Sequence, residues 1–238
     1  MNKICAMIPA RIGSERLKFK NLALINNKPL INYSIESAKK SQIFDKIVLN
    51  ADHEVFEKIA KKNNIEFYLR PKKFGGSNVK SDDVVFDFIN NFKKFETLVW
   101  VNSIAPFQTE DDIKNCINYF FKNKLDSLIT TTPFQLHGIY KKKPINFDKN
   151  KKFSKTQDLK IIEIFLYSIM MWKTKKFLKS YIKNNYGITC GKFGTFPIEK
   201  DKSILIKHVN DLEMANYYMS KKTNKKFKIK YDDLVKKI

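Results

Sequence analysis

The sequence predicts an α/β fold with a doubly wound, mostly parallel sheet of the Rossmann-like type. Short apolar runs alternate with amphipathic segments up to about residue 132, a pattern typical of strands joined by helices. The run Thr97–Val101 is almost wholly apolar, as in a central parallel strand that is buried on both faces. With 238 residues and 43% hydrophobic content, the chain is long enough for one such domain over residues 1–238.

The predicted strands and helices follow one another in a regular order. The first strand begins near Ile4 and ends at Pro9, which has no N–H for a sheet ladder and suits a strand end. Further strands are expected at residues 46–50, 66–70, 97–102 and 125–132. Helices are expected at residues 29–38, 55–62, 81–92 and 109–120. Parallel strands joined by such helices connect in the right-handed sense.

One helix start is marked by its residues. Thr109 is expected to be an N-cap, because Asp112 follows three residues later and a helical stripe of Ile113, Ile117 and Phe120 comes after it. We expect this stripe to be buried.

The alternation breaks after Pro133. Residues 138–160 are polar and rich in Lys and Asn, so we expect a small excursion from the sheet at about residues 134–171. A returning strand, a helix, a strand and a helix are then expected at residues 161–172, 174–183, 193–198 and 210–219. The lysine-rich tail from residue 221 ends in an amphipathic pattern that predicts a short helix.

Charge and cysteine content narrow the functional classes. The net charge is +22, but the lysines are spread along the whole chain among Asn and Ile, so a biased composition explains the charge better than nucleic-acid binding does. Three scattered cysteines predict no disulfide framework and a reducing compartment. No apolar stretch is long enough to span a membrane and no signal-peptide pattern is present, so we expect a cytoplasmic protein with no membrane partner.

The loop after the first strand is a candidate phosphate site. Within ten positions it presents Arg11, Gly13, Ser14, Arg16, Lys18 and Lys20. A short basic loop with a glycine, at the carboxyl end of the first strand, is where an open α/β sheet holds a phosphate. A solvated basic turn is the alternative interpretation of the same residues.

Arginine is scarce in this chain. Of the 46 Lys and Arg residues only three are arginine, namely Arg11, Arg16 and Arg70. A guanidinium is a rigid, two-pronged donor that fits phosphate oxygens, whereas an ammonium supplies a point charge. Because two of the three arginines lie in the first loop, the composition favours the phosphate interpretation.

The residues of this loop also resemble a known family. Ile8-Pro-Ala-Arg-Ile-Gly-Ser14, followed by Lys20-Asn21, resembles the opening signature of the N-acylneuraminate cytidylyltransferases, with CMP-Kdo synthetases as more distant relatives. In that family the loop wraps the triphosphate of CTP. The resemblance implies a nucleotidyltransferase fold and catalytic roles for Arg11 and Lys20. It implies nucleotide binding by Ala10, Arg11, Gly13, Ser14, Lys20 and Asn21, although Ile12 replaces the usual glycine.

A second matching stretch lies after the third strand. Arg70, followed by Pro71, and Ser81 at the next helix start stand where the family contacts the nucleotide. The alternative is that Arg70 forms a structural ion pair with Asp82 or Asp83.

Two further positions are expected to bind the sugar substrate. Asn102 stands where the family has a glutamine that reaches the substrates, and it keeps the amide on a shorter side chain. Lys155 begins the segment Lys-Thr-Gln-Asp-Leu, which is similar to the family's segment that binds the acid sugar.

The largest departure from the family concerns metal. The family holds Mg²⁺ with two aspartates, and in the gapless register Leu205 and Lys207 occupy both positions. Asp211 matches a later aspartate and is interpreted as a helix cap. Mg²⁺ is therefore expected from the resemblance, delivered with CTP, with unknown protein ligands. The three histidines are isolated and lack ligand spacing.

The resemblance implies a cytidylyltransferase that transfers CMP from CTP to an acidic nine-carbon, sialic-acid-like or related ulosonate sugar and releases pyrophosphate. The alternative is a catalytically weakened member that acts as a nucleotide-binding or partner subunit, which the missing aspartates favour. Family members dimerise through the region of the excursion, so a homodimer is expected. No general base is evident.

Overall fold

The computed structural model describes residues 3–221, and a seven-stranded mixed sheet forms its centre. The predicted helix in the tail lies outside the described residues. Across the sheet the strands are β11 (Phe193–Pro197), β7 (Ser127–Phe134), β10 (Ile162–Lys173), β6 (Thr97–Val101), β1 (Ile4–Ala10), β4 (Lys46–Ala51) and β5 (Glu66–Leu69). All neighbouring strands are parallel except for the two pairs that involve β10, so the predicted fold class is confirmed.

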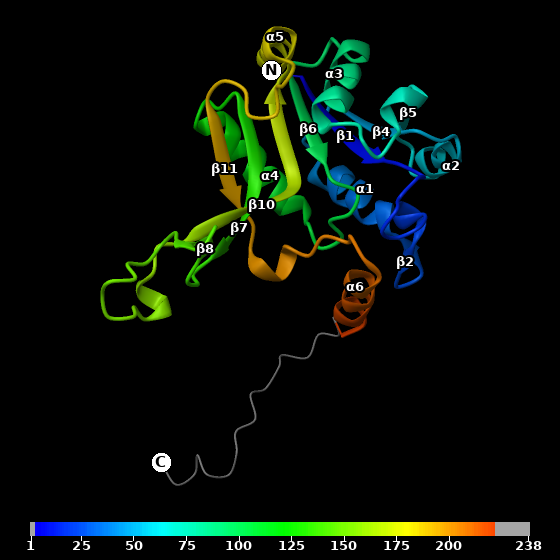
Figure 1. The fold of residues 1–238 in the computed structure, drawn as a ribbon. Helices are drawn as coiled ribbons and strands as arrows, with labels where there is room; N and C mark the ends of the chain where they lie inside the picture. The colour runs from blue at the N-terminus through cyan, green and yellow to red at the C-terminus, as the bar shows by residue number, and fades with distance from the viewer. Residues whose placement is uncertain (1–2, 222–238) are drawn as a thin grey trace.

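Helices cover both faces of the sheet (Figure 1). The residues on one face pack against α1 (Leu30–Ser41), α2 (Val55–Lys62) and α4 (Glu110–Lys122). The other face packs against α3 (Ser81–Asn91) and α5 (Thr174–Asn184). The predicted helices therefore form, with boundaries within a few residues of those expected.

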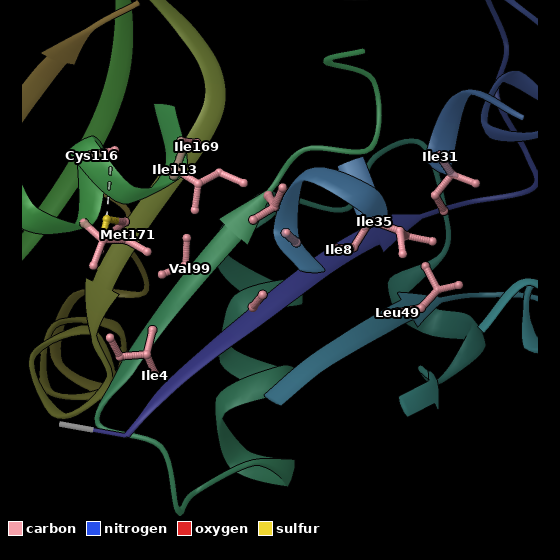
Figure 2. Packing of buried hydrophobic residues seen from close by; sticks show 14 of the residues in the cluster. Ile4, Ile8, Ile31, Ile35, Leu49, Val99, Ile113, Cys116, Ile169 and Met171 are labelled. Atoms are coloured by element: carbon pink, nitrogen blue, oxygen red, sulfur yellow. Dashed lines mark hydrogen bonds between the residues drawn. The ribbon is translucent and has the colours of Figure 1, made fainter. Parts of the chain in front are cut away.

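The first core cluster joins the centre of the sheet to α1 and α4. Figure 2 shows Ile8 of β1 near Ile35 of α1, and Val99 of β6 on the side of Ile113 of α4; all three isoleucines and Val99 are fully buried. Cys116 of α4 lies in the same cluster, as expected for a core thiol. Burial of this apolar surface is the main favourable contribution to folding.

The start of α4 has the local structure that the sequence predicts. The Asp112 N–H donates to Oγ1 of Thr109 at 3.2 Å, and the Thr109 N–H donates to Oδ2 of Asp112 at 2.9 Å. This capping box satisfies two helix-end donors reciprocally. The stripe of Ile113, Ile117 and Phe120 is fully buried, as expected.

β10 runs antiparallel to both of its neighbours, β6 and β7. For β10 to run parallel to β7, the chain would have to cross back to the opposite end of the sheet, usually through a helix. The polar segment after β7 contains no α-helix, so the chain returns from the end at which β7 stops. The register of β10 shifts between Phe165 and Met170, where Tyr167 takes a left-handed φ of 61°.

Residues 135–161 form an arm that leaves the sheet at the end of β7 (Figure 1). The arm contains β8 (Ile139–Tyr140), β9 (Lys143–Pro144) and the 3₁₀ helix η3 (Thr156–Asp158). The predicted excursion extended to residue 171, but residues 162–173 belong to the sheet as β10.

Helix α6 (Val209–Lys221) packs on a small hairpin of β2 (Leu24–Ile25) and β3 (Lys28–Pro29). Ile25 and Leu30 are buried there against Ile206 and Ala215. The remaining short elements are the 3₁₀ helices η1 (Lys20–Leu22), η2 (Lys72–Phe74) and η4 (Lys200–Lys202).

All three cysteines are free and buried. Burial raises the pKa of the Cys5 and Cys116 thiols far above the ordinary value, and it raises the pKa of Cys190 to about 11. Among residues 3–221, no helix is both long and apolar enough to cross a membrane.

Candidate functional site

The loop that follows β1 is held by side chains from neighbouring elements. The Ile12 N–H donates at 2.9 Å to Oδ1 of Asp52, which follows β4. Asn21 donates from Nδ2 to the carbonyl of Arg11 at 3.4 Å, and its Oδ1 accepts from the Ser103 hydroxyl at 2.9 Å. These bonds fix the loop against the ends of β4 and β6.

A cavity of about 290 Å³ lies at the carboxyl ends of β1 and β6. These strands are neighbours, but the chain reaches β6 only after β4 and β5 on the other side of β1, so the strand order reverses here. Open α/β sheets bind ligands in the crevice at such a switch point. The expected site residues that line this cavity are Ala10, Arg11, Ser14, Lys20, Asn21, Arg70, Ser81 and Asn102.

Two expected site residues do not line the cavity. Gly13 is exposed in the loop, its φ is not left-handed, and a Cβ at this position would meet no atom within 4 Å. The chain's own packing therefore does not require a glycine there. Lys155 is exposed on the arm, directly before η3, and is not among the residues around the cavity.

Arg70 is buried at the back of the cavity and binds main-chain carbonyls. Its guanidinium donates to Ala10 O at 2.8 Å, to Asn50 O at 2.9 Å and to Phe74 O at 3.1 Å. The ion-pair alternative is wrong, because the two aspartates at the start of α3 have other partners. Asp82 accepts from the Gly187 N–H at 2.6 Å, and Asp83 accepts from the Tyr181 hydroxyl at 2.5 Å.

Lys20 is partly buried among several other charged side chains. Burial, followed by the charges of Arg16, Arg11 and Lys207, lowers the pKa of Lys20 to about 8, while Asp211 acts in the opposite direction. These positive charges repel one another in a partly desolvated place, and a bound anion would relieve the repulsion. The arrangement therefore suits a polyphosphate.

The sequence did not single out several residues that line the cavity. Ser103 orients Asn21, and Trp100 forms part of the wall together with Phe74, Val79 and Val84. The sequence could have indicated Trp100, because residues two apart along a strand face the same side of the sheet. Asn102 was singled out, and Trp100 precedes it by two.

The described residues contain no preformed cluster of metal ligands. Within the described part of the chain, no three His, Cys, Asp or Glu side chains are grouped so that they could hold a metal ion. Oδ2 of Asp211 accepts from the N–H groups of Lys207 and His208, both at 2.8 Å, at the start of α6. Its predicted role as a helix cap is therefore confirmed.

Comparison with known proteins identifies the family. A sequence model described as cytidylyltransferase matches residues 5–235. The chain belongs to the cytidylyltransferase family. A pseudaminic acid cytidylyltransferase from Campylobacter jejuni subsp. jejuni serotype O:2 is 31% identical over 171 residues, which cover 67% of this chain and 73% of that protein.

Other relatives are longer than this cytidylyltransferase-family chain. An N-acylneuraminate cytidylyltransferase from Escherichia coli O18:K1:H7 is 30% identical over 118 residues, covering 50% of this chain and 28% of that protein. The chain thus spans about a third or less of the first curated relatives it matches. The solved CMP:2-keto-3-deoxy-manno-octonic acid synthetase complexed with CTP shares the fold, with a TM-score of 0.73 and 15% identity over 93% of this chain and 100% of that one.

The affinity for CTP is expected to fall as the pH rises above about 8, the pKa of Lys20. Lys20 is protonated below that value, and an anionic ligand binds the protonated form more tightly, so affinity is lost when the proton leaves. Calorimetric titrations on both sides of this pH measure the effect. In Lys20→Arg the guanidinium stays charged, which should flatten the profile. An equally steep profile in that variant would assign the titration to another group.

The protein without nucleotide is expected to show no measurable binding of Mg²⁺ or Mn²⁺ by calorimetry. Among its described residues no three His, Cys, Asp or Glu side chains are grouped as ligands, and without a nucleotide no phosphate oxygens complete a coordination shell. Combining Leu205→Asp with Lys207→Asp should create measurable affinity if the gapless register is correct, and Leu205→Asp alone is the matched control. Tight metal binding by the unaltered protein would contradict this prediction.

Proposed function

We propose that the chain transfers CMP from CTP to an acidic nine-carbon, sialic-acid-like or related ulosonate sugar and releases pyrophosphate. One observation carries the proposal: in a cytidylyltransferase-family chain, all the expected nucleotide-binding residues except Gly13 line a single basic cavity at the switch point of the sheet. The names of the relatives support an acidic sugar, because they are N-acylneuraminate, pseudaminic acid and 3-deoxy-manno-octulosonate cytidylyltransferases.

In the proposed reaction a sugar hydroxyl oxygen attacks the α-phosphorus of CTP. A new P–O bond forms, the bond to pyrophosphate breaks, and the hydroxyl proton is released to solvent. Such a transfer depends on positioning and on neutralisation of charge rather than on covalent participation by the protein. Arg11 and Lys20 supply cations from the loop after β1. The expected N–H group of Ser14 already donates to the Ile12 carbonyl at 3.0 Å, so Ser14 would contribute its hydroxyl, which is buried in the cavity wall and has no partner among the described residues. The N–H of Gly13 would contact a phosphate only outside the cavity lining.

The nucleoside end of CTP would lie deeper in the cavity. Asn21 and Ser81 line it. Because the Asn21 amide already bonds to Arg11 O and to the Ser103 hydroxyl, its remaining Nδ2–H is the group that would contact the ligand. Arg70 acts as a positioning residue, because its guanidinium already donates to three carbonyls. It shapes the cavity by holding the ends of β1 and β4 and the η2 segment together.

The arm is proposed to join two copies of the chain into a homodimer. It exposes apolar side chains such as Ile139 (65%), Tyr140 (66%) and Phe153 (75%). Ile161 and Ile164, where the arm rejoins β10, are also more than half exposed. Apolar surface gathered on one projecting segment is typical of an interface, and a second copy offers the complementary arm. Lys155 would then reach the partner's cavity, since it does not line its own.

The second candidate function is a nucleotide-binding or partner subunit with weakened catalysis. The absence of a carboxylate cluster among residues 3–221 favours it. Such a protein would bind CTP in the same cavity and turn it over slowly or not at all.

Pyrophosphate release from each of the four nucleoside triphosphates, measured against a panel of ulosonic acids, tests the proposal. We expect release with CTP and at least one acid. Arg11→Lys keeps the charge but loses the two-pronged donor, so kcat/KM should fall by about 10²-fold. The matched control is Lys18→Ala, which removes an exposed charge of the same loop outside the cavity. CTP binding without release of pyrophosphate would favour the partner-subunit function instead.

Light scattering at micromolar concentration is expected to give the mass of a dimer. Ile139→Glu places a charge on the arm and should shift the protein towards the monomer. Ile182→Glu is the matched control, because Ile182 is 76% exposed on α5, away from the arm. A monomeric native protein, or a dimer that Ile139→Glu and deletion of the arm both leave intact, would contradict the proposed interface.

A further inference from the structure

Trp100 is placed in the cavity wall with an unused hydrogen-bond donor. It lies in β6, opposite Met7 of β1, and its half-buried ring lines the cavity. The indole Nε1–H is buried, and it has no acceptor among the described residues. A buried indole N–H normally has a partner, because its hydration is otherwise lost without replacement.

The other tryptophan provides the contrast. Trp172 in β10 is fully buried, and its Nε1–H donates to the carbonyl of Ile188 at 2.8 Å. This chain therefore satisfies an indole donor where the tryptophan serves only the core. The unsatisfied donor is the one in the wall of the ligand cavity.

The neighbouring amide is already engaged by the chain. Asn102, two residues after Trp100 on the same side, donates from Nδ2 to the carbonyl of Tyr167 at 3.0 Å. Its Oδ1 accepts from the Ile104 N–H at 3.4 Å. Asn102 thus holds the irregular part of β10 in place. On this side of β6, the indole of Trp100 carries a donor that is buried without an acceptor among the described residues.

The surroundings of Trp100 differ from those of the loop cations. Phe74, Val79 and Val84 line the same cavity as Trp100, whereas Arg11 and Lys20 line it from the loop after β1. A planar ring fits an apolar wall that carries a hydrogen-bond donor, and a polyphosphate fits the cations. The cavity therefore offers one place for a base and another for phosphates.

We propose that Trp100 recognises the base of the bound nucleotide. Its ring packs against the pyrimidine, and its Nε1–H donates to a carbonyl or ring-nitrogen acceptor of that base. The inference rests on the proposed function, because it takes CTP as the ligand of the cavity. It assigns Trp100 a role in specificity and none in the chemical step.

Trp100→Phe keeps an aromatic ring and removes the donor. By calorimetry, CTP affinity should fall roughly three- to tenfold, as expected for one hydrogen bond. Affinity for inorganic triphosphate, which has no base, should stay unchanged. In Trp172→Phe the remaining indole is Trp100, so CTP should change the intrinsic fluorescence of that variant. The difference spectrum between native protein and Trp100→Phe gives the same information if Trp172→Phe does not fold.

The outcomes separate this inference from the proposed function. If the native protein does not bind CTP, the proposed function fails and the inference fails with it. If the native protein binds CTP and Trp100→Phe binds it equally tightly, only the inference is wrong. Equal losses for CTP and triphosphate would show a structural role and overturn it. An unchanged CTP affinity with a raised KM for the sugar acid would also overturn it, by assigning the donor to the sugar.

Discussion

The geometry of the cavity depends on the buried guanidinium of Arg70. It joins three main-chain carbonyls that belong to β1, to β4 and to the η2 segment, at distances of 2.8 to 3.1 Å. A parallel sheet fixes its strands to one another only as far as the ladder extends, and these carbonyls lie where the ladder ends. A lysine has no rigid fork with which to reach all three. Removing the guanidinium would leave buried acceptors without donors, at a cost of about 1–3 kcal/mol for each.

The sequence predicted those features that depend on local or periodic patterns. The capping box at Thr109, the order of strands and helices and the place of the first loop all follow from residues close together in the chain. Tertiary placement decided the rest. Nothing local shows that Arg70 would bind carbonyls instead of Asp82 or Asp83, that β10 would run antiparallel, or that Lys155 would lie on the arm away from the cavity. In the sequence Trp100 is one residue of an apolar strand, and only the structure places it beside the cavity.

The arginines of this chain gather around the cavity, whereas most lysines lie elsewhere. Arg11 and Arg70 line the cavity, and the charge of Arg16 acts on Lys20, so all three arginines belong to one region. The lysines elsewhere mostly supply solvation and charge, for which an ammonium is sufficient. The crowding of cations around Lys20 is unfavourable in the empty protein. This cost is tolerable where a polyanionic ligand offsets it, and it gives the cavity a preference for highly charged anions over neutral sugars.

The buried cysteines make the protein a convenient subject for site-directed labelling. Reaction with maleimides and similar reagents requires an accessible thiolate, and burial keeps Cys5, Cys116 and Cys190 protonated and shielded at neutral pH. A cysteine introduced on the exposed arm would therefore react selectively without prior removal of the native thiols. Spin or fluorescent probes attached there would report whether two arms approach each other, in a protein that keeps its native core cysteines.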